Sequence, residues 1–292
     1  MATTTTDLAR RAPALIAAVS LASLAACSGG GSGGAPPITL KGASFWLPSS
    51  NLDEAALRNI DGGAGGNFGS VIFIDDGFAE FLQEETQSSD GTIFFQENGD
   101  NFAIVSTPDG QSPSQYSDIR YLRLEYTRGG ERFVQNGIIG RFTSDDLLAD
   151  ASGTALYTGI ATSEVLVTPK TGDDFNLRPG DATVSVDFNR GVIDVVLDNF
   201  GASAAVGTPF DEVRIDGMTI TGGRFGGGTL VVLKSGTPTG DFSGGDFRSS
   251  GIFAGWNDSN GTAAGGDIPA ELGGAFLAAT TDGTVAGRYV AD

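Results

Sequence analysis

Most of this chain consists of short runs in which apolar and polar residues alternate, separated by glycine and aspartate. The clearest pair lies at residues 182–188 and 193–197, joined by the turn-forming residues Asn189, Arg190 and Gly191. Alternation with a period of two is the pattern of a β-strand with one buried face. A chain with 45 glycines and repeated breaks of this kind is therefore expected to be all-β.

The second half of the chain carries the densest alternation. Between residues 151 and 292 we count eight or nine strands, among them 182–188, 193–197, 213–221, 229–233 and a closing hairpin of 276–280 with 285–289. Closing such strands into a barrel removes exposed sheet edges. Eight strands enclose an interior that side chains just fill, so we expect an eight-stranded antiparallel β-barrel with a packed core. A ligand would then bind to loops or to the outer face.

Residues 38–150 are expected to form a smaller antiparallel β-sheet domain, open or partly curled. Its strands are predicted at 70–74, 92–96, 102–106, 120–126 and 132–139, each bounded by glycine, aspartate or proline. One helix is predicted at 51–60, where Asn51 can cap the first turn and Glu54 follows three residues later. Glycines just beyond this stretch would end the helix.

The first residues have the pattern of a bacterial lipoprotein signal and its tether. Two arginines precede an apolar run at 12–26 that is too short to span a bilayer comfortably. The run ends in Leu-Ala-Ala-Cys, the lipobox pattern, and Cys27 is the only cysteine in the chain. We therefore expect a signal peptide at 1–26, acylation of Cys27 with palmitate-type chains, and a flexible glycine- and serine-rich linker at 27–37.

The charge balance excludes several classes of function. After removal of the signal, 35 acidic and 15 basic residues remain, and the chain has no histidine. Nucleic-acid binding and docking to an anionic membrane surface both need clustered Lys and Arg, so neither is expected. Without histidine or a second cysteine, the chain cannot build a Ser-His-Asp triad, a Cys-His pair or an ordinary zinc site. We expect no enzyme activity and no cofactor, and we interpret aspartate pairs such as Asp145 with Asp146 as solvated turns.

One segment near the C-terminus, residues 251–276, combines glycine, phenylalanine and glutamate in an arrangement that predicts strand, loop, short helical turn and strand. Asp267 and Pro269 would start the helical turn. The positions that we expect to be structural are Phe253, Gly255, Glu271, Gly273, Gly274 and Phe276. Phe253 and Gly255 would close the first strand, and the paired glycines would end the turn. The glutamate carboxylate would accept backbone N–H bonds and hold the loop.

This skeleton, Phe-x-Gly followed by Ala-Glu-x-Gly-Gly-x-Phe, resembles the C-terminal barrel signature of transferrin-binding-protein-B-like surface lipoproteins, which include factor H-binding proteins. The stretches 140–143 and 153–159 are similar to the linker and first barrel strand of that family, although the expected proline before the strand is absent. The resemblance implies a handle-like domain at 38–150 and a barrel at 151–292. It also implies a lipid anchor in the outer membrane of a Gram-negative cell and exposure at the cell surface. Delivery there would use a surface-lipoprotein translocation machinery, and the captured partner would be a protein or an iron- or haem-type ligand.

The family motif is compact, whereas this chain inserts thirteen residues at 256–268. We take Trp256, Asn257, Asp258 and Asn260 as the candidate ligand-contact loop, because a tryptophan on a polar loop has the size and amphipathic edge of an interface anchor. Capping the barrel mouth is the alternative role for the tryptophan. Two other functions stay open: a structural or assembly lipoprotein of the envelope with no soluble ligand, and a periplasm-facing solute binder.

Overall fold

The computed structural model of the chain describes 14 segments, and the structural statements below concern these residues. They are 39–48, 56–64, 72–75, 78–81, 84–87, 93–97, 101–111, 114–128, 131–167, 176–201, 210–239, 246–255, 268–279 and 283–292. Cys27 and the predicted linker lie outside them. No helix within these segments is long and apolar enough to cross a membrane. Contacts join Pro37–Asp292 into one compact unit, so the predicted division at residue 150 stays a prediction.

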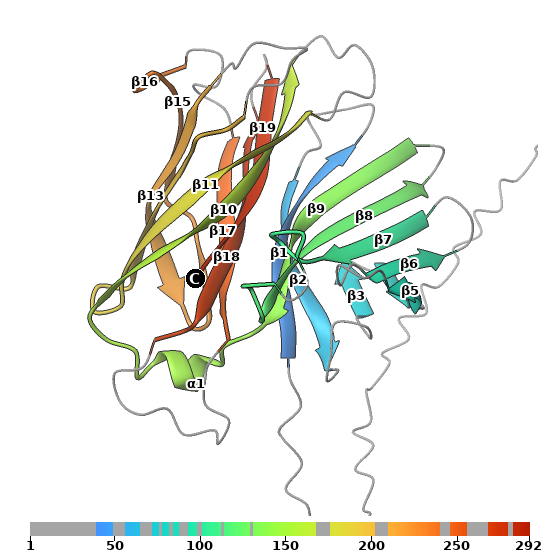
Figure 1. Cartoon of the computed structure of the whole chain (residues 1–292), viewed down its shortest axis with the longest axis horizontal. Helices are drawn as coiled ribbons and strands as arrows, with labels where there is room; N and C mark the ends of the chain where they lie inside the picture. Colours follow the sequence, from blue (N-terminus) through green and yellow to red (C-terminus); the bar gives the residue numbers. More distant parts are fainter. Residues whose placement is uncertain are drawn as a thin grey trace, which may run out of the picture. The chain divides into compact units, whose positions relative to one another are not determined.

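Nine strands of the N-terminal half form one antiparallel sheet (Figure 1). They are β1 (Thr39–Pro48), β2 (Ala56–Ala64), β3 (Ile72–Asp75), β4 (Phe78–Phe81), β5 (Glu84–Gln87), β6 (Ile93–Glu97), β7 (Asn101–Ser106), β8 (Ile119–Arg128) and β9 (Glu131–Arg141). Their order across the sheet is β4-β3-β2-β1-β9-β8-β7-β6-β5, so β1 and β9 pair in the middle. The predicted antiparallel sheet is confirmed, with β1, β2, β4 and β5 added to the predicted strands.

The predicted helix at 51–60 is wrong over residues 56–60, which belong to β2, and residues 51–55 lie outside the described segments. This strand pairs with β1 in antiparallel register, with Ile60 opposite Gly42. Ladder hydrogen bonds and the burial of Ile60 outweigh a weak local helix signal. The predicted cap Asn51 lies outside the described residues.

The C-terminal half closes into a barrel of eight antiparallel strands, which confirms the predicted fold. Its strands are β10 (Thr154–Val167), β11 (Asn176–Asp187), β12 (Val192–Asp198), β13 (Glu212–Thr221), β14 (Arg224–Gly226), β15 (Thr229–Lys234), β16 (Thr237–Pro238), β17 (Asp246–Ala254), β18 (Glu271–Ala279) and β19 (Gly283–Ala291). The ring runs β10-β11-β12-β13-β14-β17-β18-β19 and returns to β10. β14 and β15 both pair with β13 and together act as one strand antiparallel to it. This strand is interrupted at Gly227 and Gly228, where φ is positive. β16 pairs with the end of β15.

A short helix, α1 (Asp145–Leu148), links the sheet to the barrel. Ser144 caps its N-terminus by accepting a hydrogen bond from the backbone N–H of Leu147. Asp145, which we expected in a solvated turn, is the first residue of α1, and its carboxylate accepts the backbone N–H of Gly223 at 2.9 Å. This bond holds the link against the β13–β14 turn.

Aromatic and aliphatic side chains fill the barrel interior, as predicted for eight strands. Three aromatic rings each lie against a glycine directly opposite on the next strand: Phe225 on Gly251, Phe276 on Gly287 and Tyr289 on Gly274. A Cβ atom on Gly251 would lie 2.3 Å from the ring of Phe225, so no side chain fits there. These positions need glycine because the ring occupies the space of the missing side chain.

The predicted helical turn near Glu271 is also wrong. Gly273 and Gly274 lie inside the strand β18 and pair with β19. A Cβ atom on Gly274 would come within 2.6 Å of the hydroxyl oxygen of Tyr289. The paired glycines, which signal a helix end in the sequence, therefore serve here to admit an aromatic ring.

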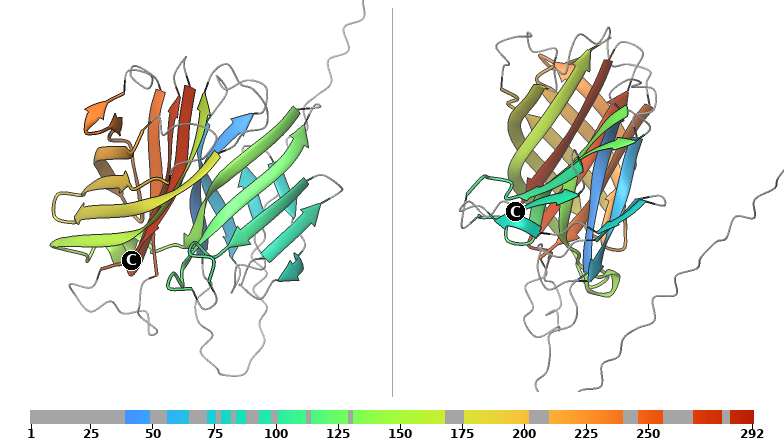
Figure 2. Two further views of the ribbon diagram at one scale, coloured as in Figure 1. Left: turned by 45° about the horizontal axis from the view of Figure 1, so that its top comes forward. Right: turned by 90° about the vertical axis from the view of Figure 1, so that its right-hand side faces the viewer.

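The wall formed by β17, β18 and β19 is buried on both faces. Its inner face carries Phe253 and Phe276, and its outer face packs on the N-terminal sheet (Figure 2). Two apolar clusters join the sheet to this wall: Ala43 and Phe45 with Ala275, Leu277 and Ala286, and Tyr116, Ile119, Tyr121 and Ile138 with Ile252, Ala254 and Val290. The sheet thus covers the apolar outer face of these three strands.

Substitution of Gly251 by alanine tests the ring-on-glycine packing. The added methyl group overlaps the ring of Phe225, so we expect Gly251→Ala to lower the free energy of unfolding by about 1–3 kcal/mol. The matched control is Gly201→Ala, because the nearest atom to a Cβ there lies 3.8 Å away. Urea denaturation of both variants measures the difference, and equal stabilities would contradict this packing.

Candidate functional site

The candidate site is the end of the barrel that carries the predicted insertion 256–268 between β17 and β18, of which residues 256–267 lie outside the described segments. The predicted contact residues Trp256, Asn257, Asp258 and Asn260 lie outside the described residues. The two flanks of the insertion, Gly255 and Ile268, are described. Ile268 is 41% exposed and, with Leu156, is one of two large apolar side chains that are exposed within the described segments. What the structure defines is therefore the two flanks of the insertion, which we call its base.

Backbone hydrogen bonds tie the two flanks of the insertion together. Gly255 accepts a bond from the backbone N–H of Ala270 at 3.1 Å and donates its own N–H to the carbonyl of Arg141 at 3.3 Å. Its φ of +72° is a left-handed conformation that favours glycine. A Cβ atom on Gly255 would lie 2.6 Å from a carboxylate oxygen of Asp118. Gly255, where the sequence predicts a strand end, therefore contacts three other segments of the chain, those that contain Asp118, Arg141 and Ala270.

Two further contacts close the base of the insertion. The Tyr157 hydroxyl donates to the carbonyl of Pro269 at 2.9 Å, so the first barrel strand holds the chain immediately after the insertion. Arg141 and Asp118 form an ion pair at 3.3 Å. This pair is partly exposed and contributes little to stability, but it fixes the turn before β8 against the end of β9.

Glu271 connects the barrel to the N-terminal sheet at this end. Its side chain is 3% exposed and projects from the outer face of β18. The carboxylate accepts the backbone N–H groups of Ser117, Asp118 and Ile119 at 2.6, 3.1 and 2.9 Å, and the Ser117 hydroxyl at 3.2 Å. Three successive N–H groups around one carboxylate form an anion-binding nest. The segment that Glu271 holds is the turn 117–119 of the sheet rather than its own loop.

Burial sets the protonation behaviour of Glu271. Desolvation raises the pKa of its carboxyl group above the ordinary value, although the hydrogen bonds from Asp118 and Ser117 act in the opposite direction. Arg120 lies nearby and donates to the carbonyl oxygens of Tyr116 and Ile119 at 2.6 and 2.8 Å. Burial lowers the pKa of this arginine. Its positive charge offsets part of the cost of burying the carboxylate.

The loop between β7 and β8 packs onto the barrel beside Glu271. Asp109 organises its described part by accepting the backbone N–H groups of Gln111 and Gln115 and the Ser114 hydroxyl, at 3.1, 3.0 and 2.8 Å. Burial raises the pKa of the Asp109 carboxyl group, but these hydrogen bonds outweigh it and hold the pKa below its usual value. Tyr116 is fully buried against the barrel wall, and burial raises its pKa to about 12.

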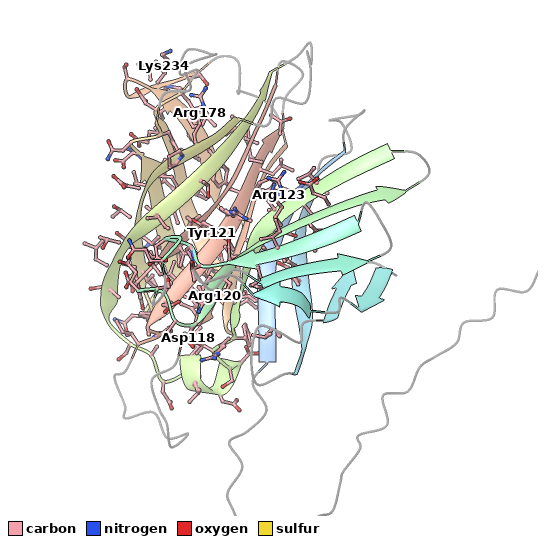
Figure 3. All side chains as sticks on the ribbon, turned by 45° about the vertical axis from the view of Figure 1, so that its right-hand side comes forward. Asp118, Arg120, Tyr121, Arg123, Arg178 and Lys234 are labelled. Atoms are coloured by element: carbon pink, nitrogen blue, oxygen red, sulfur yellow. The ribbon has the colours of Figure 1, made fainter. Side chains whose placement is uncertain are left out.

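Two barrel arginines bind carbonyl groups of the sheet. Arg288 on β19 donates to the carbonyls of Leu122 and Gly137 at 2.8 and 3.3 Å, and its guanidinium lies 4.0 Å from the ring centre of Tyr121. Arg224 on β14 donates to the carbonyls of Gly42 and Ile60, both at 3.0 Å. Figure 3 shows Asp118 and Arg120 near the foot of the barrel and Tyr121 and Arg123 farther along β8.

The residues that the sequence singled out fall into two groups. Gly255 and Glu271 meet at the base of the insertion, whereas Phe253, Phe276 and the paired glycines belong to the barrel core and wall. The sequence did not indicate Asp118, Arg224 or Arg288. Within the described segments, no three acidic residues come together as a metal site.

Comparison with known proteins supports a fold rather than a family. No family model matches the chain, and no curated protein matches its sequence. Among solved structures, the chain is similar to isotype 1 transferrin-binding protein B from serogroup B Neisseria meningitidis. The TM-score is 0.51 at 16% identity, over 87% of this chain and 43% of that one. A variant of transferrin-binding protein B from Haemophilus parasuis Hp5 gives 0.49 at 18% identity, over 87% and 44%. The chain thus has the transferrin-binding-protein-B-like fold and spans less than half the length of these proteins.

Removal of the Glu271 carboxylate tests its role between barrel and sheet. Glu271→Ala leaves the N–H groups of residues 117–119 without their acceptor, and that of Ile119 is buried, so we expect a loss of about 1–3 kcal/mol in the free energy of unfolding. Amide hydrogen exchange at 117–119 should accelerate in the native state. In the control Glu212→Ala, which breaks the solvent-exposed pair with Arg214, stability should change by less than about 1 kcal/mol. Unchanged exchange at 117–119 in Glu271→Ala would refute the role.

The raised pKa of Glu271 predicts a pH dependence with a defined sign. The folded state binds this proton more tightly than the unfolded state, so the contribution of Glu271 to stability is largest below its unfolded pKa near 4.5 and falls as the pH rises through the folded value. The stability difference between wild type and Glu271→Gln should therefore shift in favour of the wild type on acidification from pH 7 to 4.5. Urea denaturation across this range measures it, and a shift in favour of the variant would contradict the prediction.

Proposed function

We propose that this protein is a lipid-anchored outer-membrane protein that captures a protein or an iron- or haem-type ligand at the cell surface without catalysing a reaction. The observation that carries the proposal is the likeness of 87% of the chain to transferrin-binding protein B of Neisseria meningitidis. The lipobox ending in Cys27 supports the anchor independently, because it is a pattern in the sequence and does not depend on the likeness in fold.

The filled barrel favours binding at the outside of the molecule. Its interior holds buried side chains from every strand of the ring, including Phe225, Phe253 and Phe276. One wall is covered by the N-terminal sheet, which leaves the remaining outer face, the barrel ends and the sheet edges for a partner. Among these, the end that carries residues 256–267 combines a fixed base with an inserted loop. We therefore assign ligand contact to Trp256, Asn257, Asp258 and Asn260.

Transferrin is one candidate ligand, because the similar proteins are described as transferrin-binding proteins. The chain corresponds to less than half of each of them, so its ligand has to be tested among several. Iron-loaded transferrin, haemoglobin and haem are suitable purified probes for residues 28–292. Haem binding would be followed by absorbance, and protein binding by biolayer interferometry.

The anchor predicts where the protein is found in the cell. Wild-type protein should fractionate with the outer membrane and be digested when intact cells are treated with an external protease. Cys27→Ser should move it to the soluble fraction and prevent labelling with a palmitate analogue. Protection from protease until the outer membrane is breached would instead favour the periplasm-facing solute binder.

Deletion of residues 256–267 tests the binding site. Because Gly255 and Ala270 are already bonded to each other, a short glycine link should leave the barrel folded. We expect at least a tenfold loss of affinity for the ligand and little change in melting temperature. Full affinity in the deletion variant would show that the binding site lies elsewhere. If the protein retains only envelope proteins and no soluble ligand, the structural lipoprotein is favoured instead.

A further inference from the structure

The chain enters its folded body at the end of the barrel that carries Gly255 and Ile268, which we call the binding end. Leu40, at the start of β1, is paired with Arg141 in β9, and the carbonyl of Arg141 accepts the backbone N–H of Gly255 at 3.3 Å. From the spacing of paired strands and ordinary bond lengths, the Cα atoms of Leu40 and Gly255 lie at most about 13 Å apart. The predicted tether therefore joins the body beside the binding end.

The length of the tether limits how far the binding end can move from the predicted anchor. Thirteen peptide steps join Cys27 to Leu40, and they include a run of glycine and serine at 28–34. A segment of this length spans at most about 47 Å when fully extended, and its mean end-to-end distance is about 20 Å if it behaves as a glycine-rich coil. Lipid chains on Cys27 would hold that residue at the bilayer surface. The binding end would then stay within about 60 Å of the bilayer, and on average much closer.

Rotation of the folded body does not turn the binding end outwards. The longest barrel strand, β10, has 14 residues. Strands of this length, tilted as in other barrels, give a barrel about 35 Å high. To point Gly255 away from the membrane, the tether would have to run back along this height, which uses most of its extended length. Few conformations of a flexible chain are that long, so the binding end faces the bilayer most of the time.

The space beneath the binding end restricts what can bind there. A folded protein of 100 residues has a radius of gyration of about 13 Å and hence a diameter above about 30 Å, which exceeds the mean span of the tether. Haem and iron chelates are far smaller. We propose that the binding end faces the membrane and takes a compact ligand of the size of haem or an iron chelate rather than a folded protein. This assignment rests on the anchor and the site of the proposed function.

Two cysteine variants compare the two ends of the barrel in the full, acylated protein. Ile268→Cys marks the binding end at an exposed position. Thr237→Cys is the matched control, also at an exposed position. β14 begins opposite the end of β17, and the chain then runs through β15 to β16, away from Gly255. Thr237 in β16 therefore lies at the end of the barrel opposite α1 (Figure 1).

Streptavidin serves as a probe of protein size after each cysteine has been labelled with a biotin maleimide. In lipid vesicles, the small maleimide should label both positions, whereas streptavidin should bind the biotin at 268 at least fivefold less than the biotin at 237. The soluble form, residues 28–292, should show no such difference. A longer tether, with about 30 further glycine and serine residues after Gly34, should restore streptavidin binding at 268 in vesicles.

The possible failures of this experiment are distinguishable. Equal streptavidin binding at both positions in vesicles, or no recovery with the longer tether, would overturn the orientation. Iron-loaded transferrin or haemoglobin that binds the vesicle-bound and soluble forms with equal affinity would overturn the compact ligand. A protein that does not associate with vesicles at all would overturn the anchor of the proposed function, and this assignment with it.

Discussion

Burial of the barrel wall on both faces is the constraint on which the rest of the structure depends. β17, β18 and β19 carry aromatic residues inward and press their outer face against the sheet. Small residues on this outer face admit larger side chains of the sheet: Gly273 lies against Ile119, and Ala275 and Ala286 pack in one cluster with Phe45. Inward, the glycines opposite Phe276 and Tyr289 make room for the rings. Residue size on these three strands thus decides both the barrel core and the contact with the sheet.

The charged side chains buried between the barrel wall and the sheet each make several hydrogen bonds. Burying a charge is costly unless hydrogen bonds replace its water. Glu271 meets three backbone N–H groups, and Arg288 meets two carbonyls and an aromatic ring. Each partner set comes from one local stretch of the sheet, so a shifted register would leave the charge buried without partners. The two charges therefore specify how the sheet lies on the barrel.

The sequence predicted the fold best where one face of a strand is exposed to solvent. Runs such as 182–188 alternate cleanly, because their polar residues face solvent, and the barrel followed from them. β18 is apolar on both faces, so its sequence does not alternate. Its paired glycines were therefore interpreted wrongly as the end of a helical turn. β2 was misread because a local cap signal ignores its partner strand β1. Arg224 and Arg288 could not be foreseen, since their acceptors lie more than a hundred residues away.

A barrel built this way concentrates functional variation at its ends and edges. Substitutions inside the core or between wall and sheet meet fixed neighbours on every side, as the short Cβ distances at Gly251 and Gly274 indicate. The insertion after Gly255 is different, because its described flanks are bonded to each other, to Arg141 and to Tyr157. A loop on such a base can change in length and composition at little cost to stability. The same base keeps whatever the loop binds at a defined place relative to the sheet.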